Sequence, residues 1–299
     1  MYDIVIIGAG PSGMTAALYA LRANKKVLVL EALTYGGQII NTLKIDNYPG
    51  IPGVSGVDFA TNLYNQIMNM GCEFKFEKVV NIESADKHHV VVTNSDNRYD
   101  TRCVIIATGA TNKKLGIANE DKFIGRGISY CATCDGNFYK EKVVAVNGGG
   151  NTAIEDAIYL SNICSKVYLI HRRDEFRASE VLVDELKEKD NVTFILNSNV
   201  TGLVGNDKLE KIEINNSREL PVDALFIAIG QVPETNNFTS LLELDQNGYV
   251  ISEDMRTKIP GIYVCGDVRS KTLRQLTTAV SDGSLAATSA INDLNNKII

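Results

Sequence analysis

The feature that most constrains the fold is a βαβ opening that this chain contains twice. The two copies are Asp3-Ile-Val-Ile-Ile7 followed by Gly8-Ala-Gly-Pro-Ser-Gly13, and Lys142-Val-Val-Ala-Val146 followed by Gly148-Gly-Gly-Asn-Thr-Ala153. A helical pattern and a second apolar run come next. The residue after that run, Glu31 in one copy and His171 in the other, lies 23 positions beyond the first glycine. This is the spacing of a dinucleotide-binding fingerprint. The repeat predicts an α/β protein with two Rossmann-like, three-layer (ββα) nucleotide-binding domains.

The first of these domains is expected to be discontinuous. Val104-Ile-Ile-Ala-Thr-Gly109 closes the first unit as Leu225-Phe-Ile-Ala-Ile-Gly230 closes the second. A further strand-like run, Gly261-Ile-Tyr-Val-Cys-Gly-Asp267, then precedes a helical pattern from Arg274 to Leu294. A chain of 299 residues is long enough for two separate cores. The expected ranges are residues 1–113 and 242–299 for the first domain and 114–241 for the inserted domain.

The first glycine stretch favours FAD or NAD over NADP. Its glycines allow the backbone to approach a pyrophosphate, which the following helix N-terminus stabilises. Glu31 would accept hydrogen bonds from a ribose 2′-hydroxyl and would repel a 2′-phosphate; the plainer alternative is a solvated strand end. The expected contacts are Gly8, Gly10, Pro11, Ser12, Gly13 and Glu31.

The second glycine stretch has the opposite charge preference. Three arginines, Arg172, Arg173 and Arg177, stand where an acidic residue would bind a ribose diol. Guanidinium groups match phosphate oxygens, so the pattern favours NADPH; the alternative is an ordinary basic helix start. His171 would contact ribose or phosphate. The remaining expected contacts are Gly148, Gly150, Asn151, Thr152, Ala153 and Gly230.

A Cys-x-x-Cys pair, Cys131 and Cys134, lies between the two fingerprints. Such a pair can close a small disulfide ring and exchange two electrons. A zinc site would need further ligands, and no histidine stands at a ligand spacing from the pair. We therefore expect a redox dithiol and no metal. The other cysteines, in apolar runs or otherwise isolated, are expected to be structural; they are Cys72, Cys103, Cys164 and Cys265.

Composition narrows the partners and the location. The net charge is −6 and no block of basic residues stands out, which gives a nucleic-acid partner little support. The apolar run that follows Met1-Tyr2-Asp3 is too short for a signal peptide, and no run approaches the roughly 20 residues of a membrane span. These patterns favour a cytoplasmic protein without a membrane partner.

Taken together, these motifs resemble the low-molecular-weight NADPH-dependent thioredoxin reductases. The resemblance covers essentially the whole chain and includes Gly36-Gly-Gln38, Asn47-Tyr-Pro-Gly50, Cys131-Ala-Thr-Cys-Asp-Gly136 and His171-Arg-Arg-Asp-Glu-Phe-Arg-Ala178. It implies an FAD domain made of both chain ends, an inserted NADPH domain carrying the dithiol, and a homodimer. The further FAD contacts that it implies are Gly36, Gly37, Gln38, Asn47, Ala107, Thr108, Gly109, Gly266, Asp267, Val268, Arg274, Gln275 and Leu276.

The resemblance also implies a mechanism. Electrons would pass from NADPH through FAD and the dithiol to oxidised thioredoxin or a thioredoxin-like protein. Cys134 would face the flavin, and Cys131 would attack the partner disulfide. Asp135 would exchange protons with the thiols, although the following Gly136 also makes it a plausible turn residue.

Three alternatives use some of the same motifs. A flavin-dependent dithiol oxidase would keep the cysteine pair but has no need of the arginine-containing stretch, and a ferredoxin-linked reductase would be expected to lose the second fingerprint. A nucleotide-dependent redox sensor would need no cysteine pair joined to both nucleotide sites. A yellow protein that NADPH bleaches would be a reductase.

Overall fold

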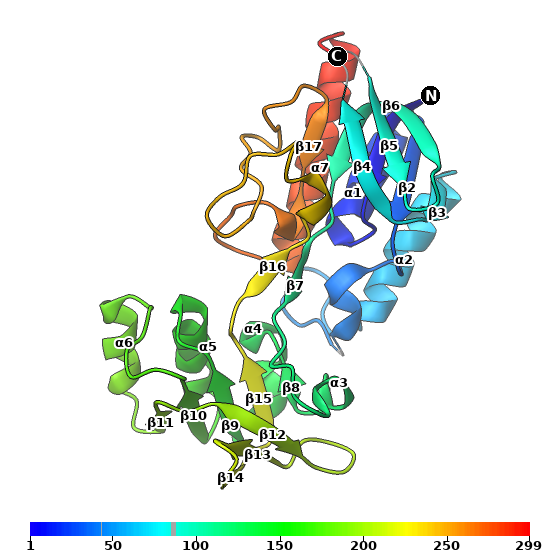
Figure 1. Cartoon of the computed structure of the whole chain (residues 1–299). Helices are drawn as coiled ribbons and strands as arrows, with labels where there is room; N and C mark the ends of the chain where they lie inside the picture. Colours follow the sequence, from blue (N-terminus) through cyan, green and yellow to red (C-terminus); the bar gives the residue numbers. More distant parts are fainter. Residues whose placement is uncertain (43, 85–87) are drawn as a thin grey trace. The chain divides into compact units, whose positions relative to one another are not determined.

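The computed structural model describes residues 1–42, 44–84 and 88–299, and its contacts divide the chain into two units (Figure 1). The first unit contains Met1–Ile40, Tyr48–Thr111 and Val232–Ile299, and the second contains Asn41–Asn47 and Asn112–Gln231. The chain passes between them through two short paired strands, which are β7 (Ala110–Asn112) and β16 (Gln231–Pro233).

The second crossing lies earlier in the chain than the sequence pattern indicates. Residues 232–241, which we placed in the inserted domain, belong to the first unit. The reason is apolar burial: Phe238 and Leu242 pack with Val5 and Ile106 in the core of the first unit. Because these hydrophobic side chains are buried in that core, the segment between β16 and Leu242 packs with the first unit.

The sheet of the first unit has a parallel centre and an antiparallel extension. Its strand order is β3-β2-β1-β6-β5-β4, with β17 also paired to β6. Thr101 of β6 pairs with β5, whereas Val104 to Ile106 pair with β17, so the two strands share one edge of β6. The strands are β1 (Tyr2–Ile7), β2 (Val27–Glu31), β3 (Glu73–Phe76), β4 (Val79–Ser84), β5 (His89–Thr93), β6 (Arg98–Ile106) and β17 (Ile262–Val264).

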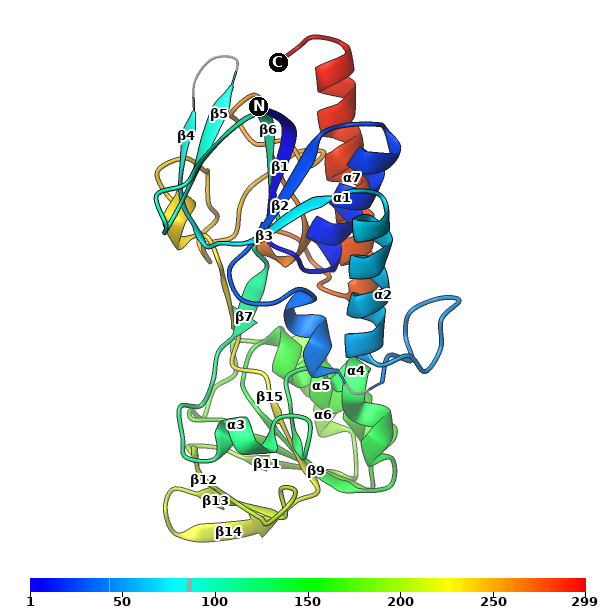
Figure 2. The same cartoon turned by 90° about the vertical axis from the view of Figure 1, so that its right-hand side faces the viewer.

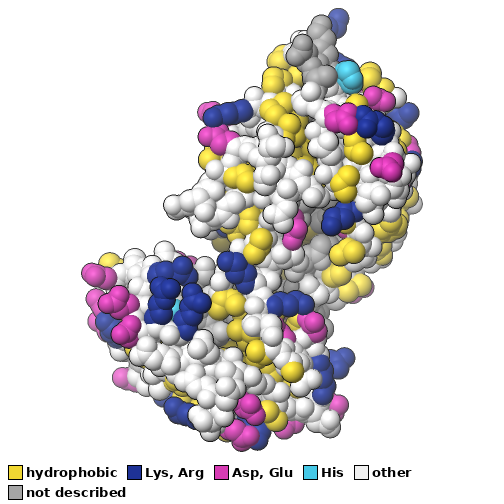
Figure 3. Space-filling model, viewed as in Figure 1, with side chains coloured by type: hydrophobic (Ala, Val, Ile, Leu, Met, Phe, Trp, Pro, Cys, Tyr) yellow, Lys and Arg dark blue, Asp and Glu magenta, His cyan; other side chains and the backbone are white. Residues whose placement is uncertain are grey.

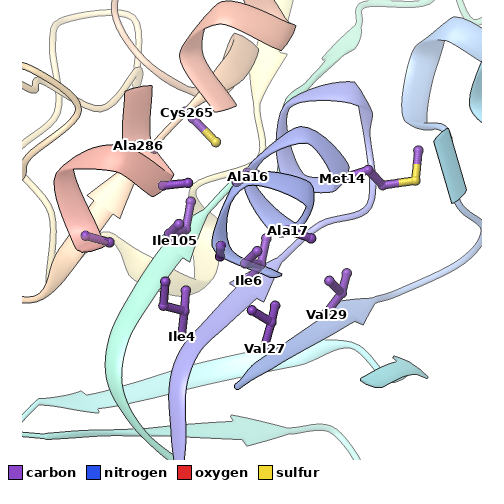
Figure 4. Packing of buried hydrophobic residues seen from close by; sticks show 14 of the residues in the cluster. Ile4, Ile6, Met14, Ala16, Ala17, Val27, Val29, Ile105, Cys265 and Ala286 are labelled. Atoms are coloured by element: carbon purple, nitrogen blue, oxygen red, sulfur yellow. The ribbon is translucent and has the colours of Figure 1, made fainter. Parts of the chain in front are cut away.

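Helices cover one face of this sheet. Successive residues of β1 face opposite sides, so Ile4 and Ile6 pack with Ala16 and Ala286 while Val5 belongs to the cluster on the other face (Figure 4). α1 and α7 lie side by side in both orientations (Figures 1 and 2). The helices are α1 (Pro11–Arg22), α2 (Gly56–Asn69) and α7 (Leu276–Asn295), with short turns η1 (Gly37–Asn41), η3 (Asn236–Phe238) and η4 (Gly266–Val268).

The second unit repeats the plan with a five-stranded parallel sheet of order β11-β10-β9-β15-β8. Ala153 and Leu160 of α5 pack on one face, and Leu203 and Ile212 of a three-stranded antiparallel sheet join the cluster on the other. The elements are β8 (Ile128–Ser129), β9 (Val143–Asn147), β10 (Lys166–Ile170), β11 (Val192–Ile195), β12 (Val200–Val204), β13 (Lys211–Ile214), β14 (Arg218–Pro221), β15 (Ala224–Ile227), α3 (Glu120–Phe123), α4 (Ala132–Asp135), η2 (Gly136–Tyr139), α5 (Asn151–Ser161) and α6 (Glu180–Lys187).

The predicted α/β class with two Rossmann-like units is confirmed. Both copies of the repeat form strand, helix and strand, as β1-α1-β2 and β9-α5-β10, and both sheets are parallel at these strands. In the described part of the chain, no helix combines the length and the apolar character that crossing a membrane requires.

Candidate functional site

The first glycine stretch forms a tight turn from β1 into α1. Gly8 has a φ of +103°, and its N–H donates to the Leu30 carbonyl at 2.8 Å. A Cβ on Gly13 would lie 1.9 Å from the Gly8 oxygen, so only glycine lets α1 start this close to β1. Gly10, just before the helix, has no atom within 4 Å of its Cβ position, and Pro11 needs no N–H partner there. The turn thus leaves an open helix N-terminus suited to an anion.

Glu31 at the end of β2 is held at this turn. Its Oε2 accepts the Ala9 N–H at 2.8 Å, and its Oε1 accepts the Leu33 N–H at 2.9 Å. The carboxylate is half-buried and fixed by two backbone donors rather than free at a strand end. Because each carboxylate oxygen can accept more than one hydrogen bond, Glu31 can still receive a ribose hydroxyl.

The segment after β2 also reaches the turn. The Gly36 N–H donates to the Ala9 carbonyl at 2.7 Å, and a Cβ on Gly37 would lie 3.2 Å from the Gly10 Cα. Gln38 follows in η1. The structure therefore brings two of the predicted glycines directly against the first glycine turn.

The predicted residues after β6 divide between two environments. Ala107 lies beside the first glycine turn, since a Cβ on Gly8 would be 2.5 Å from the Ala107 oxygen. Thr108 Oγ1 donates to the Glu234 carbonyl at 2.7 Å, and the Glu234 N–H donates to the Gly109 carbonyl at 3.0 Å. Asn47 falls in the second unit by its contacts. Within the first unit, the structure brings Ala107 and the backbone of Thr108 to the turn, since a Cβ on Gly8 would also lie 3.2 Å from the Thr108 Cα.

A second turn, Gly266–Val268, lies against the start of α1. Gly266 has a φ of +78°, and a Cβ there would lie 2.4 Å from Ser12 Oγ. Arg274 donates to the carbonyl of Asp267 in this turn at 3.3 Å and to the carbonyls of Arg269 and Lys271 just after it at 3.2 Å. Its guanidinium lies 3.9 Å from the Tyr249 ring centroid. The two predicted residues that follow at the start of α7 are Gln275 and Leu276.

The glycine turn of the second unit has the same construction. The Gly148 N–H donates to the Ile170 carbonyl at 3.0 Å, and the Cβ position of Gly150 is open. Asn151 Oδ1 accepts the Ser179 N–H at 2.9 Å, which ties the segment before α6 to the first turn of α5. Two more predicted residues lie in that first turn, Thr152 and Ala153. Gly230, by contrast, lies at the crossing and accepts the Lys113 N–H at 3.0 Å.

His171 has a position that the sequence did not indicate. Its ring covers Gly149, where a Cβ would come within 2.2 Å of ring atoms, and it stacks on Phe176 with centroids 5.4 Å apart. Nε2 lies 3.2 Å from the Glu175 carbonyl oxygen. Burial, then the neighbouring arginines, lower the pKa of His171 and favour the neutral ring. Its contact with a nucleotide stays a prediction.

The three predicted arginines of this segment are exposed. No carboxylate of the described residues lies within ion-pair distance of Arg172, Arg173 or Arg177. The Arg177 N–H donates to the Gly149 carbonyl at 2.8 Å, which fixes the segment to the glycine turn. Figure 3 shows a cluster of basic side chains on this unit. Three uncompensated cations beside an open helix N-terminus can bind a phosphorylated ribose.

Cys131 and Cys134 form a disulfide at the start of α4. Cys131 is the residue before the helix, and its Sγ accepts the Cys134 N–H at 3.2 Å. Gly136 follows α4, and a Cβ there would lie 2.9 Å from the Tyr159 ring on α5. The glycine therefore lets the short helix pack closely on α5. Both cysteines are half-buried, so the pair is anchored in the unit while each residue keeps part of its surface exposed.

Asp135 belongs to the same hydrogen-bond chain as the dithiol. Its Oδ2 accepts the Ser129 hydroxyl at 2.7 Å, and the Ser129 oxygen accepts the Cys131 N–H at 3.1 Å. Burial raises the pKa of Asp135, opposed by the Ser129 hydrogen bond. Asp135 thus keeps its proton to higher pH than an exposed aspartate and can donate it. Sequence reasoning missed Ser129, which lies two residues before Cys131 in a strand of two residues.

The remaining cysteines are buried free thiols, which confirms their structural character. Burial raises the pKa of Cys72, Cys103 and Cys265 to about 12 and that of Cys164 to about 11. A thiol with so high a pKa forms almost no thiolate near neutral pH. The dithiol pair alone therefore carries the redox chemistry of the described cysteines.

Comparisons with known proteins agree with this architecture. Residues 2–283 match the family described as pyridine nucleotide-disulphide oxidoreductase. The thioredoxin reductase of Listeria monocytogenes is 42% identical over 97% of this chain and 93% of its own length. That of Bacillus subtilis is 40% identical over the same shares. The crystal structure of thioredoxin reductase from Streptococcus pyogenes superposes with a TM-score of 0.94 at 42% identity, covering 99% of each chain. The chain therefore belongs to the pyridine nucleotide-disulphide oxidoreductases and, within them, to the thioredoxin reductases.

Proposed function

We propose that this protein reduces oxidised thioredoxin with electrons from NADPH, which pass through FAD and the Cys131–Cys134 dithiol. The observation that carries the proposal is the half-buried disulfide, hydrogen-bonded through Ser129 to a carboxyl group with a raised pKa. The same chain has two glycine turns, one with an acidic residue beside it and the other with three arginines beside it. The thioredoxin reductases at about 40% identity over nearly the whole chain support the substrate.

The first unit fits FAD. Its open helix N-terminus at Gly10 would hold the pyrophosphate, and Glu31 would accept a ribose hydroxyl. Asp267, which follows the glycine that touches Ser12, would face a further hydroxyl of the cofactor. When bound, FAD supplies the two-electron chemistry that links a hydride donor to a disulfide.

The second unit fits NADPH. The Gly150 turn would accept the pyrophosphate, and Arg172, Arg173 and Arg177 would bind the 2′-phosphate. His171, neutral and packed on Gly149, would keep the arginine segment against the turn. The preference for NADPH over NADH therefore rests on these exposed cations.

The dithiol would act in two steps. Two electrons and two protons convert the disulfide into two thiols, and Asp135 would donate one of these protons to the sulfur that reduction releases. Asp135 would take the proton back when Cys131 attacks as a thiolate. The Cys131 thiolate would attack one sulfur of the thioredoxin disulfide, which breaks that bond and forms a mixed disulfide. Cys134 would then attack the Cys131 sulfur, which breaks the mixed disulfide and re-forms the protein disulfide. Thioredoxin leaves as a dithiol, and the two protons lost by Cys131 and Cys134 balance those that its sulfurs gain.

A homodimer and a cytoplasmic location complete the proposal. Large apolar side chains are exposed on the helices of the first unit, with Tyr19 on α1, Val57 on α2 and Leu285 on α7 each at least 45% exposed. An exposed apolar surface of this kind favours association with a second copy. The four buried free thiols are consistent with a reducing compartment. Sedimentation equilibrium of the flavin-loaded protein tests the dimer.

An anaerobic titration tests the function. The purified yellow protein is titrated with NADPH and, separately, with NADH, and oxidised thioredoxin is then added. The proposal expects bleaching of the flavin at low NADPH concentration and return of the colour with thioredoxin. Failure of NADPH to bleach would remove the arginine argument and favour a dithiol oxidase. Bleaching without recovery would leave the cofactors in place and exclude thioredoxin as substrate.

A further inference from the structure

A buried lysine lies beneath the Gly266–Val268 turn of the first unit. The side chain of Lys271 is only 7% exposed, and its Nζ lies 3.1 Å from Asp267 Oδ1 and 3.1 Å from Asp282 Oδ2. It also donates to Thr278 Oγ1 at 3.4 Å. Burying an ammonium group is unfavourable unless charges and acceptors compensate it, so its position between two carboxylates has to be explained.

Asp282 is one of the two carboxylates beside Lys271. It projects from α7, is 5% exposed, and its Oδ2 accepts the Gly266 N–H at 3.1 Å and Arg269 Nε at 2.9 Å. Arg269 thus supplies a counter-charge to Asp282 even without the lysine. Asp282 anchors the turn to α7, and Lys271 is an additional partner for it rather than its only cation.

Asp267 has no such second partner. Its Oδ1 is buried and accepts no hydrogen bond from the described residues, although Lys271 lies within ion-pair distance. The side chain as a whole is 31% exposed, so the rest of the carboxylate remains reachable. Lys271 is the one cation among the described residues within ion-pair distance of Asp267.

The place of Asp267 gives this ion pair a consequence for ligand binding. The preceding Gly266 touches Ser12 at the start of α1, where the proposed pyrophosphate would bind. A carboxylate beside a dianion is repulsive unless a cation offsets it, yet it is also a good acceptor for a hydroxyl of the same ligand. The Lys271 ammonium, 3.1 Å from one carboxylate oxygen, offsets the negative charge and leaves the rest of the carboxylate to accept a hydroxyl.

We propose that Lys271 is a positioning residue for the flavin nucleotide, which orients the Asp267 carboxylate and offsets its charge beside the pyrophosphate. This inference rests on the proposed assignment of FAD to the first unit. It makes a specific statement about energetic coupling: the effect of Lys271 on FAD affinity passes through Asp267. Removal of the carboxylate should therefore make the lysine dispensable for binding.

A double-mutant cycle tests this coupling without any assay of turnover. Flavin is stripped from wild type, Lys271→Met, Asp267→Asn and the double variant, and FAD dissociation constants are measured by the change in flavin fluorescence. Lys271→Met should weaken FAD by about tenfold or more in the wild-type background and by less than about threefold in the Asp267→Asn background. Lys258→Met, at an exposed surface ion pair of the same unit, is the matched control and should change nothing. Thermal melting of each apoprotein reports its folding.

The outcomes separate the inference from the function beneath it. An equal loss of affinity in both backgrounds, or no loss in either, overturns the positioning role. A wild-type apoprotein that binds no FAD overturns the cofactor assignment itself. If Lys271→Met does not fold, the double variant and Asp267→Asn are compared directly, because the double variant removes both charges of the pair. A difference above about threefold between them refutes the proposal.

Discussion

The replacement of Arg172 by alanine should change nucleotide preference without changing the fold. The side chain is exposed and makes no ion pair among the described residues, so the free energy of unfolding should change by less than about 0.5 kcal/mol. A hydrogen bond between a guanidinium and a phosphate contributes about 1.5–3 kcal/mol. Since 1.4 kcal/mol is a factor of ten, NADPH should bind roughly 10- to 150-fold more weakly. Exposure to solvent places the expected value near the lower limit.

NADH provides the internal comparison, because it lacks the 2′-phosphate. Dissociation constants and kcat/KM are measured for both nucleotides at two salt concentrations. Arg172→Ala should weaken NADPH and leave NADH within about twofold, and the difference should shrink as ionic strength rises. Arg218→Ala, an exposed arginine on β14 of the same unit, serves as the control. Equal weakening of both nucleotides would refute the reasoning, since the arginine would then contribute to something other than phosphate recognition.

Three further predictions follow from the geometry. Gly13→Ala should lower the free energy of unfolding by about 1–3 kcal/mol, because the new Cβ would lie 1.9 Å from a carbonyl oxygen. Gly10→Ala has open space for its Cβ, so it should keep its stability but lose flavin. Urea unfolding and flavin content distinguish the two variants. Asp135→Asn should reduce kcat with thioredoxin by roughly 10²-fold and remove the decline in rate as pH rises through the raised pKa of this carboxyl, with NADPH binding unchanged. Burial raises the pKa of Asp156 on α5 from 3.8 to about 7, so the wild-type protein loses stability as the pH rises between these values. At pH 8, Asp156→Asn should therefore be more stable than wild type by on the order of 2–4 kcal/mol. At pH 4 the two proteins should be equally stable, and thermal melts at both pH values measure the difference.

The repeated βαβ units were predictable from sequence because local patterns determine them. In the second copy, the helical pattern after the glycines forms α5, and the apolar run that follows it forms β10. Buried parallel strands are continuous apolar runs in the sequence, and glycines between such a run and a helical pattern identify the turn from strand to helix. Backbone architecture therefore follows from residues close together in the sequence.

The surroundings of the dithiol were less accessible to sequence reasoning. Ser129 reaches Asp135 because a two-residue strand and a four-residue helix place them together, and neither element is long enough to produce a periodic pattern. The buried contact of Lys271 with Asp282 joins residues eleven positions apart through a turn held by tertiary packing. Lysine and aspartate are ordinarily exposed, so composition gives no signal of such a pair.

The two glycine turns share one backbone construction, yet their side chains suit ligands that stay bound for different lengths of time. Glu31 is fixed by two backbone donors before any ligand arrives, so little side-chain freedom remains to be lost when a ribose binds. Arg172, Arg173 and Arg177 are exposed and form no ion pair with the residues that the structure describes, so binding must order them at a cost of about 0.5–1.5 kcal/mol per side chain. A preformed acceptor suits a cofactor that stays bound, whereas cations that order on binding suit a reductant that must leave after each turnover. The proposed assignment of FAD to the first unit and NADPH to the second follows this physical difference as well as the difference in charge.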